Sequence, residues 1–177
     1  MTPVFQRPAV SAVDQGVEEG PAILDDLNSS RLSAISLNSR HNFTIPLAPF
    51  LDLLVKAYGP DLVLRLDVAD ASIRSHPDHL ESALRNLLDN AFRHGAGQPV
   101  ELRVFRRGGR VVFQVRDRGS EISAGNRERI FQRFFTTERD SGGTGLGLAI
   151  AKAVADTRGG RLDFETGPDG TSFELVL

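Results

Sequence analysis

A glycine-rich run that leads into a helical pattern limits what this chain can fold into. Four glycines lie within residues 141–147, and apolar residues then recur at helical spacing over residues 146–157. Glycine lets a backbone approach a ligand closely, and a helix N-terminus presents free N–H groups with a partial positive charge. The run therefore favours a cradle for a polyphosphate. Taken alone, it fits a flexible loop that caps a helix as well.

Two common phosphate-binding loops do not match this run. No Gly-Lys-Ser or Gly-Lys-Thr closes it, which excludes the P-loop of many nucleotide hydrolases. No strand pattern leads into it, as the dinucleotide-binding βαβ unit requires. If the run binds phosphates, it does so in another kind of fold.

A second feature is an amphipathic pattern over residues 77–94. Its apolar positions are Leu80, Leu84, Leu87, Leu88 and Ala91. This spacing predicts a long helix with one apolar face. Asn86 and Asn90 lie four residues apart on the polar face, followed by Arg93 and His94. Amide oxygens suit Mg²⁺, and an arginine suits phosphates, but the same residues also fit a solvated polar face.

The remaining patterns predict a mixed α/β domain. We expect strands at 43–47, 62–67, 100–106, 110–116, 161–166 and 171–177, helices at 49–58, 77–94 and 146–157, and a loop at 119–143. Gly108-Gly109 and the GPDG sequence between the last two strands predict two hairpins. The predicted fold is a two-layer α/β sandwich, in which three helices cover one face of a mixed sheet of about five strands.

Bulk composition narrows the class of protein. The chain has 177 residues and 40% hydrophobic residues, enough for one domain with a real core. A net charge of −2 gives no sign of nucleic-acid or membrane-surface binding, and the lack of cysteine excludes disulfides and thiolate metal sites. No apolar run approaches the ~20 residues that span a bilayer. We expect a cytoplasmic domain, with any inner-membrane anchor of a parent protein outside this chain.

An acidic turn follows the predicted strand at 110–116. Asp117 ends the strand, and Gly119 follows two residues later. A carboxylate at a strand end can accept a hydrogen bond from an exocyclic amine such as that of adenine. A plain strand-ending turn explains the same residues.

The order of these features resembles a known family. NLLDNA at 86–91, DRG at 117–119, IFQRFF at 130–135 and GGTGLGLAI at 142–150 follow one another. This series resembles the histidine-kinase branch of the ATPase superfamily that gyrase, heat-shock chaperone and mismatch-repair ATPases share. The resemblance covers about residues 43–177 and implies a Bergerat-type ATP-binding fold. It divides the chain into a tail or linker at 1–41, with a short helix at 22–35 as a remnant of a dimerisation helix, and an ATP-binding catalytic domain at 42–177.

The resemblance implies ATP and Mg²⁺ as cofactors and assigns roles to individual residues. Asn90 would hold Mg²⁺ with help from Asn86, and Asp117 would bind the adenine amine, helped by Gly119 through a water. Arg133 would neutralise phosphate charge during transfer. The other implied nucleotide contacts are Arg93, His94, Ile122, Phe134, Gly143, Thr144, Gly145, Leu146, Gly147, Leu148 and Thr171. A mobile lid would span residues 120–142, with Ile130, Phe131, Arg133, Phe134 and Phe135 forming a hydrophobic patch at its base.

One position separates transfer of a phosphoryl group from hydrolysis. The hydrolysing relatives carry Glu where Asn86 stands, and that Glu activates water. An amide cannot act as a general base near neutral pH. The resemblance therefore implies a protein-histidine kinase domain that donates the γ-phosphate of ATP to a histidine. The implied partners are a histidine-containing dimerisation domain and a response regulator, and we expect the isolated domain to be monomeric.

None of the histidines in this chain fits the acceptor. His41 loosely matches the family's phosphoacceptor box, but Asn42 follows it where an acidic residue is usual. The sequence between His41 and Asn90 is already needed for the first strand and helix, so the two-helix dimerisation hairpin has no room. His76 and His79 are interpreted as exposed residues at a helix start. We therefore expect the acceptor on a separate domain that this chain does not contain.

A departure from the family pattern leaves other hypotheses open. The family has Asp-x-Gly-x-Gly, and Glu121 stands at the second glycine. If that position needs positive φ, a glutamate costs about 1 kcal/mol or more. Its charge also lies near the lid. The alternative to a kinase domain is a regulatory docking module, which binds nucleotide weakly and contacts a kinase or response regulator. A serine kinase acting on a regulatory protein is a third hypothesis.

Overall fold

The computed structural model describes residues 42–68, 71–137 and 143–177. The predicted tail at 1–41, its helix at 22–35 and His41 lie outside these residues. So do Ser141 and Gly142 of the glycine run and the end of the predicted lid. The part of the lid that the structure describes is called the 120–137 loop below.

The main sheet has five strands in the order β2-β4-β5-β7-β6. The strands are β2 (Leu62–Leu66), β4 (Val100–Arg107), β5 (Arg110–Arg116), β6 (Arg161–Gly167) and β7 (Gly170–Val176). β2 pairs with β4 in parallel, and the other pairs are antiparallel, so the sheet is mixed. Gly108 and Gly109 have φ values of 58° and 81°, which is why glycines form the first hairpin turn.

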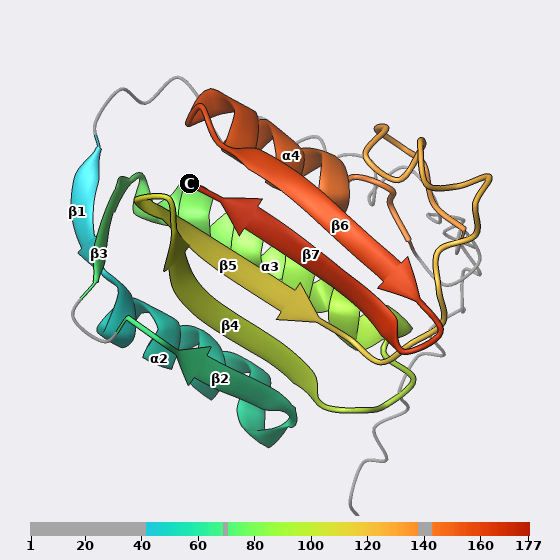
Figure 1. The fold of residues 1–177 in the computed structure, drawn as a ribbon, viewed down its shortest axis with the longest axis horizontal. Helices are drawn as coiled ribbons and strands as arrows, with labels where there is room; N and C mark the ends of the chain where they lie inside the picture. Colours follow the sequence, from blue (N-terminus) through green and yellow to red (C-terminus); the bar gives the residue numbers. More distant parts are fainter. Residues whose placement is uncertain (1–41, 69–70, 138–142) are drawn as a thin grey trace, which may run out of the picture.

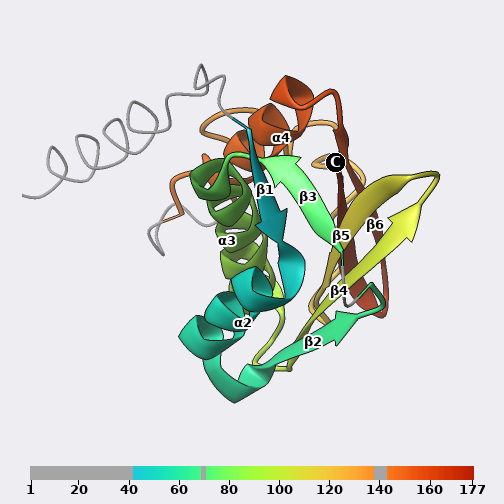
Figure 2. The ribbon, with the colours of Figure 1, turned by 90° about the vertical axis from the view of Figure 1, so that its left-hand side faces the viewer.

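Helices cover one face of this sheet, and the other face is open (Figures 1 and 2). They are α2 (Leu47–Tyr58), α3 (Pro77–His94) and α4 (Gly147–Thr157), with a 3₁₀ turn η1 (Gly59–Asp61) after α2. The predicted two-layer sandwich with three helices is therefore confirmed. Helix α2 begins two residues before the predicted start, and Gly59 ends it with φ 76°.

A small second sheet was not predicted. β1 (Phe43–Pro46) pairs antiparallel with β3 (Ser72–Ser75), and neither strand joins the main sheet. Figure 1 shows this pair at the end of the domain away from the 120–137 loop. β3 has only four residues, and Ile73 is its single apolar side chain, so the sequence carries no strand pattern there.

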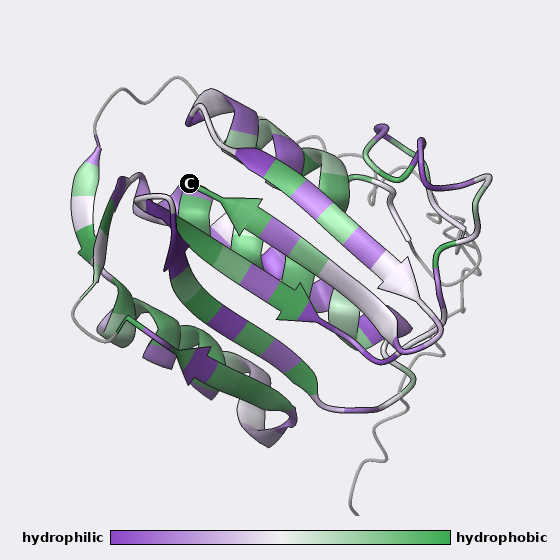
Figure 3. Cartoon of the chain, viewed as in Figure 1, coloured by the Kyte–Doolittle hydropathy of each residue, from purple (hydrophilic) through white to green (hydrophobic). Residues whose placement is uncertain are grey.

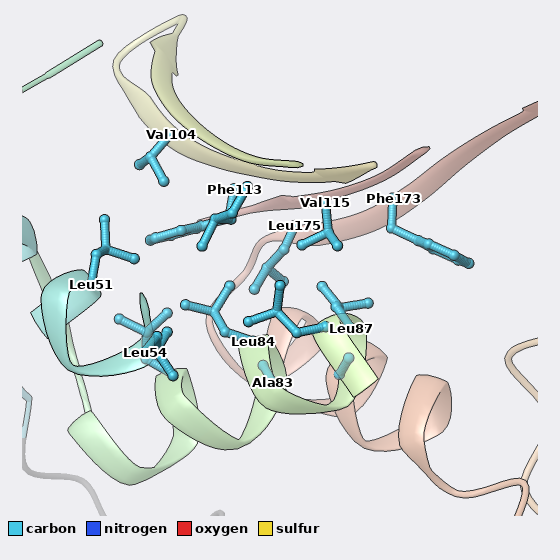
Figure 4. Close-up of a cluster of buried hydrophobic side chains, with 14 of the residues drawn as sticks. Leu51, Leu54, Ala83, Leu84, Leu87, Val104, Phe113, Val115, Phe173 and Leu175 are labelled. Atoms are coloured by element: carbon cyan, nitrogen blue, oxygen red, sulfur yellow. The ribbon is translucent and has the colours of Figure 1, made fainter. Parts of the chain in front are cut away.

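The core lies between the sheet and the helices. Leu84 and Leu87 of α3 point toward Phe113 and Val115 of β5 and toward β7, and these side chains are fully buried (Figure 4). Polar and apolar residues alternate along β6, so its apolar residues face the helices (Figure 3). Each fully buried leucine contributes roughly 1.5–3 kcal/mol. This burial sets the rotation of α3 and therefore the direction of its polar face.

The interpretation of His76 and His79 as exposed residues is wrong. The side chain of His76 is 19% exposed, and His79 is buried. Its relative exposure is 3%, and its ring stacks on that of His76 at a centroid distance of 4.5 Å. Arg158, at the end of α4, places a guanidinium nitrogen 3.3 Å from Nδ1 of His79. The end of α4 thus covers the first turn of α3, a contact that the local sequence does not show.

The structure has no helix suited to a bilayer within the residues it describes. The predicted cytoplasmic location stays a prediction.

Candidate functional site

A cavity of about 540 Å³ opens between α3, the start of α4, the ends of β5 and β7, and the 120–137 loop. This is an ordinary size for a cofactor site. Most of the predicted nucleotide contacts line it, namely Asn86, Asn90, Arg93, His94, Asp117, Ile122, Gly143, Thr144, Gly145, Gly147, Leu148 and Thr171. Residues more than 80 positions apart in the chain are therefore brought together at one site.

One end of the cavity is built around Asp117, which directly follows β5 and is 2% exposed. Its Oδ1 accepts the backbone N–H of Gly119 at 2.8 Å and that of Thr171 at 3.3 Å. The backbone N–H of Asp117 donates to the carbonyl of Thr171 at 2.9 Å. Within the residues that the structure describes, no protein hydrogen bond occupies Oδ2 of Asp117. A fixed carboxylate with one open oxygen suits a ligand that carries an amine.

Close backbone approaches hold this turn in place. A Cβ on Gly119 would lie 1.8 Å from the carbonyl oxygen of His94, so the end of α3 rests directly on the turn. A Cβ on Gly170 would lie 2.1 Å from the carbonyl oxygen of Asp117, and Gly170 has φ 114°. Only glycine fits these contacts without moving the backbone.

The other end of the cavity carries the amide pair. Nδ2 of Asn86 donates to the carbonyl of Ser82 at 2.8 Å, which turns Oδ1 away from its own helix backbone. A Cβ on Gly147 would lie 3.1 Å from that Oδ1, so the glycine leaves space at the amide oxygen. Asn90, one turn further along α3, also lines the cavity. Two amide side chains at the wall of one cavity fit a hard cation such as Mg²⁺.

The glycine loop ends against the 120–137 loop. The backbone N–H of Phe134 donates to the carbonyl of Gly145 at 2.9 Å. Gly145 has φ 65°, and a Cβ there would lie 2.5 Å from the carbonyl carbon of Phe134. α4 begins two residues later, so its N-terminal N–H groups lie at the cavity. This end can hold an anion.

Four predicted site residues do not line the cavity. Gly119 lies behind Asp117, and Leu146 is 5% exposed beneath the glycine loop. Arg133 is exposed on the 120–137 loop. Phe134 is 63% exposed and has φ 64°. Their nucleotide roles stay predictions.

The predicted hydrophobic patch at the base of the lid is partly buried. Ile130 is 8% exposed, and the ring of Phe131 meets that of Phe164 edge-to-face at 5.8 Å. The guanidinium of Arg129 lies 4.6 Å from the ring centroid of Phe135. The burial of Ile130 and the Phe131–Phe164 contact fasten the 120–137 loop to the body of the domain, whereas the Arg129–Phe135 contact lies within the loop.

The expected strain at Glu121 does not arise. Among the residues described by the structure, only Ala96 and Phe134 combine a side chain with positive φ. Glu121 therefore has an ordinary backbone conformation. Glu121 is exposed and lines the cavity, which the sequence had not indicated; its charge was predicted only to lie near the lid.

Sequence reasoning missed several lining residues. They include Asp89, Ser120, Ser123, Asn126, Thr136, Thr137 and Phe173. Asp89 lies three residues after Asn86 on one helix, and Phe173 lies two residues after Thr171 on one strand. These spacings could have identified both. The others lie in a loop without periodic pattern.

Asp89 also has a partner from another helix. The hydroxyl of Tyr58, at the end of α2, donates to Oδ1 of Asp89 at 2.6 Å. Its ring stacks on Phe92 at 5.3 Å. Burial, followed by this hydrogen bond, raises the pKa of Tyr58 above its ordinary value. The tyrosine thus stays protonated and holds one carboxylate oxygen at the edge of the cavity.

Comparison with known proteins identifies the family that this geometry belongs to. Residues 75–177 match the family model described as "Histidine kinase-, DNA gyrase B-, and HSP90-like ATPase". The sensor histidine kinase YkoH of Bacillus subtilis is 33% identical over 130 residues, which are 71% of this chain and 28% of that protein. The sensor histidine kinase MtrB of Mycolicibacterium paratuberculosis is 33% identical over 173 residues, which are 95% of this chain and 28% of that protein.

A solved structure agrees with these matches. The mycobacterial sensor histidine kinase MprB superposes with a TM-score of 0.65 and 27% identity, covering 77% of this chain and 96% of that chain. The chain spans about a quarter of the length of the two curated relatives named above.

Proposed function

The chain belongs to the histidine kinase-, DNA gyrase B- and HSP90-like ATPase family, as the catalytic ATPase domain of a sensor histidine kinase, and on that premise we propose that it donates the γ-phosphate of Mg-ATP to a histidine on a separate dimerisation domain. Membership of this family implies ATP binding in a two-component system. The acceptor, the metal and the roles of individual residues are part of the proposal.

The residues that line the cavity support this proposal for each part of the nucleotide. Asp117, through Oδ2, would accept the adenine amine, with Gly119 and Thr171 holding the carboxylate. The backbone from Gly143 to Gly147, with the N-terminus of α4, would hold the phosphates. Asn90 and Asn86 would hold Mg²⁺ through their amide oxygens. Bound Mg²⁺ neutralises phosphate charge, and phosphoryl transfer depends mainly on such neutralisation and on positioning.

We favour phosphoryl transfer over hydrolysis because of one residue, Asn86. Asn86 lies against Gly147 at the start of α4, and the resemblance gives hydrolysing relatives a water-activating Glu at the position of Asn86. Its amide cannot take a proton from water near neutral pH. The neighbouring carboxylate of Asp89 already has one oxygen bonded to Tyr58. The site thus favours holding ATP until another nucleophile arrives.

The proposed transfer needs no protein base, because the proton on the other ring nitrogen of the acceptor histidine stays there. A ring nitrogen of the acceptor histidine uses its lone pair to form the N–P bond. The P–O bond between the γ-phosphorus and the bridging oxygen breaks, and ADP leaves with that electron pair. Arg133, exposed on the 120–137 loop, would meet the developing charge when an acceptor domain is present. A response regulator would then take the phosphoryl group from the histidine.

The test mixes the purified chain with the dimerisation domain of its parent protein and γ-labelled ATP. We expect acid-labile, base-stable label on the acceptor domain and almost no free phosphate without it. Asn86→Glu should raise phosphate release, because a carboxylate then stands where water can be activated. Release of phosphate by the wild type regardless of the acceptor would exclude this proposal. Acid-stable label would favour a serine kinase instead.

The docking-module alternative loses its main structural support. It rested partly on strain at Glu121, and that residue has an ordinary φ. Calorimetry with Mg-ATP decides between the two: no detectable binding by the folded wild-type chain would favour the docking module.

A further inference from the structure

The hydroxyl of Thr166 joins the 120–137 loop to the β6–β7 hairpin. The backbone N–H of Ile122 donates to Oγ1 of Thr166 at 2.8 Å. Oγ1 of Thr166 lies 2.9 Å from Oγ1 of Thr171, so one hydroxyl donates to the other. Thr166 and Thr171 are opposite each other across the β6–β7 pair. A single hydroxyl, that of Thr166, therefore connects the 120–137 loop with β7.

Thr171 continues this connection to the buried carboxylate. Its N–H donates to Oδ1 of Asp117 at 3.3 Å, and its carbonyl accepts the N–H of Asp117 at 2.9 Å. Thr171 is 4% exposed, and both it and Asp117 line the cavity. An unbroken series of contacts thus runs from Asp117 through Thr171 and Thr166 to Ile122.

The hydroxyl of Thr166 already makes two hydrogen bonds. A hydroxyl has one donor and two acceptor positions. Oγ1 of Thr166 accepts from Ile122 and exchanges one further bond with Thr171. Replacing this oxygen by a methyl group leaves the N–H of Ile122, which is half-buried, without that partner. It also leaves the hydroxyl of Thr171, at the wall of the cavity, free to rotate.

The same strand holds the loop at a second place. Phe164 lies two residues before Thr166, so both side chains project from one face of β6. The ring of Phe164 meets Phe131 of the 120–137 loop at 5.8 Å. Figure 1 shows β6 at the edge of the sheet, ending beside this loop. The aromatic contact is apolar, whereas the Thr166 hydroxyl is hydrogen-bonded to Thr171 of the Asp117–Thr171 pair.

We propose that Thr166 is a positioning residue that couples the Asp117–Thr171 end of the cavity to the 120–137 loop. The proposal rests on the proposed binding of ATP. A nucleotide base that contacts Thr171 restricts its hydroxyl, and Thr166 transmits that restriction to the N–H of Ile122. Because such coupling is reciprocal, holding Ile122 in place also favours a bound base. Thr166 lies outside the lining of the cavity, so it acts through its neighbours.

The test compares Thr166→Val with Thr166→Ser in the whole 177-residue chain. Valine keeps the shape and removes the hydroxyl, whereas serine keeps the hydroxyl. We expect valine to speed amide hydrogen exchange at Ile122 by about tenfold or more and to weaken ATP binding about fivefold, the range of one hydrogen bond. We also expect ATP to protect the 120–137 loop less in this variant. Serine should restore both measurements.

Three controls accompany the comparison of Thr166→Val with Thr166→Ser. Thr157→Val removes a hydroxyl at the exposed end of α4 that donates to the carbonyl of Val154 and, among the described residues, to no other group, and it should change neither measurement. In Thr166→Val combined with Thr171→Val, the loss of ATP affinity should be smaller than the product of the single losses, because both remove one bond. In the wild type, Ile122 should exchange more slowly than Glu121 and Ser123, a measurement that needs no variant.

The outcomes separate this inference from the proposed function. If the wild type does not bind ATP, the proposed function fails, while slow exchange at Ile122 still tests the Thr166 bond. If the wild type binds ATP and Thr166→Val has normal affinity and loop protection, only the coupling is excluded. If serine is as defective as valine, the methyl group rather than the hydroxyl is responsible, and the proposal is also overturned.

Discussion

The two ends of the cavity are built in different ways. At the Asp117 end, a carboxylate that is 2% exposed accepts two backbone N–H groups, and backbones meet at Gly119 and Gly170 with no space for a side chain. At the glycine-loop end, Asn86 and Asn90 are half-buried and Thr144 is exposed. There Asn86 and the first residues of α4 line the cavity.

This difference follows from the elements that form each end. The Asp117 end lies on adjacent strands of one sheet, whose ladder sets the backbone positions before any ligand arrives. The glycine-loop end lies between two helices and two loops, and its polar groups have few protein partners. A rigid end with one buried carboxylate and an open, polar end suit a ligand that has a planar ring bearing an amine and a charged tail. Substitutions at each end of the cavity test whether the two ends differ in this way.

The largest effect is expected from Gly119→Ala, which disturbs the close packing at the rigid Asp117 end. The new Cβ would lie 1.8 Å from the carbonyl oxygen of His94, so backbone must move. We expect the free energy of unfolding to fall by about 3 kcal/mol, measured by urea denaturation. Gly125→Ala is the matched control, since no atom lies within 4 Å of its added Cβ. Equal stability of the two variants would contradict the close packing described here.

Asp117→Asn should separate ligand binding from folding at the same end. Asparagine keeps an acceptor for the N–H groups of Gly119 and Thr171 but loses the charge that an amine prefers. We expect the dissociation constant for ATP to rise about 100-fold, as for a lost bond to a charged group, with little change in melting temperature. Asp169→Asn, in the exposed β6–β7 turn, serves as control. A change below threefold would place the base elsewhere.

Asn90→Ala should act at the open end and only through the metal. We expect ATP affinity in Mg²⁺ to fall roughly tenfold, a usual size for disturbing a metal site, while affinity in a chelator stays unchanged. Titration calorimetry with and without Mg²⁺ measures both values. Gln98→Ala, on the exposed turn after α3, should leave both unchanged. If the effect of Mg²⁺ survives in Asn90→Ala, this residue is not a ligand.

The smallest effect is expected from Gly147→Ala, which should raise the stability of the domain and lower its affinity for ATP. Alanine favours the helix and should stabilise α4 by about 0.5 kcal/mol. Its Cβ would lie 3.1 Å from Oδ1 of Asn86, crowding the proposed metal ligand. We therefore expect a higher melting temperature and an ATP affinity reduced about threefold. A fall in both stability and affinity would mean that the open end is packed more tightly than described.

Regular patterns explain which elements could be predicted. Helix α3 matches its predicted bounds of 77–94, because a proline starts it and apolar residues recur along its whole length. Both hairpins are placed correctly because glycines mark their turns. β3 was missed because a four-residue strand with one apolar side chain has no period to detect. The ordered motifs identified most of the residues that line the cavity, but they gave no means to find Asn126, Thr136 or Thr137.

By itself, the sequence determined the helices, the hairpins, the two-layer architecture and the family, because these depend on spacing within single segments and on the order of motifs. Only the tertiary structure decided that β1 leaves the main sheet, that Arg158 covers His79, and that Thr166 joins Ile122 to Thr171. Each of these depends on which distant groups meet after packing. The spacing of residues within one segment does not predict such partners, because a hydroxyl or an imidazole bonds to whatever group the fold brings within about 3 Å.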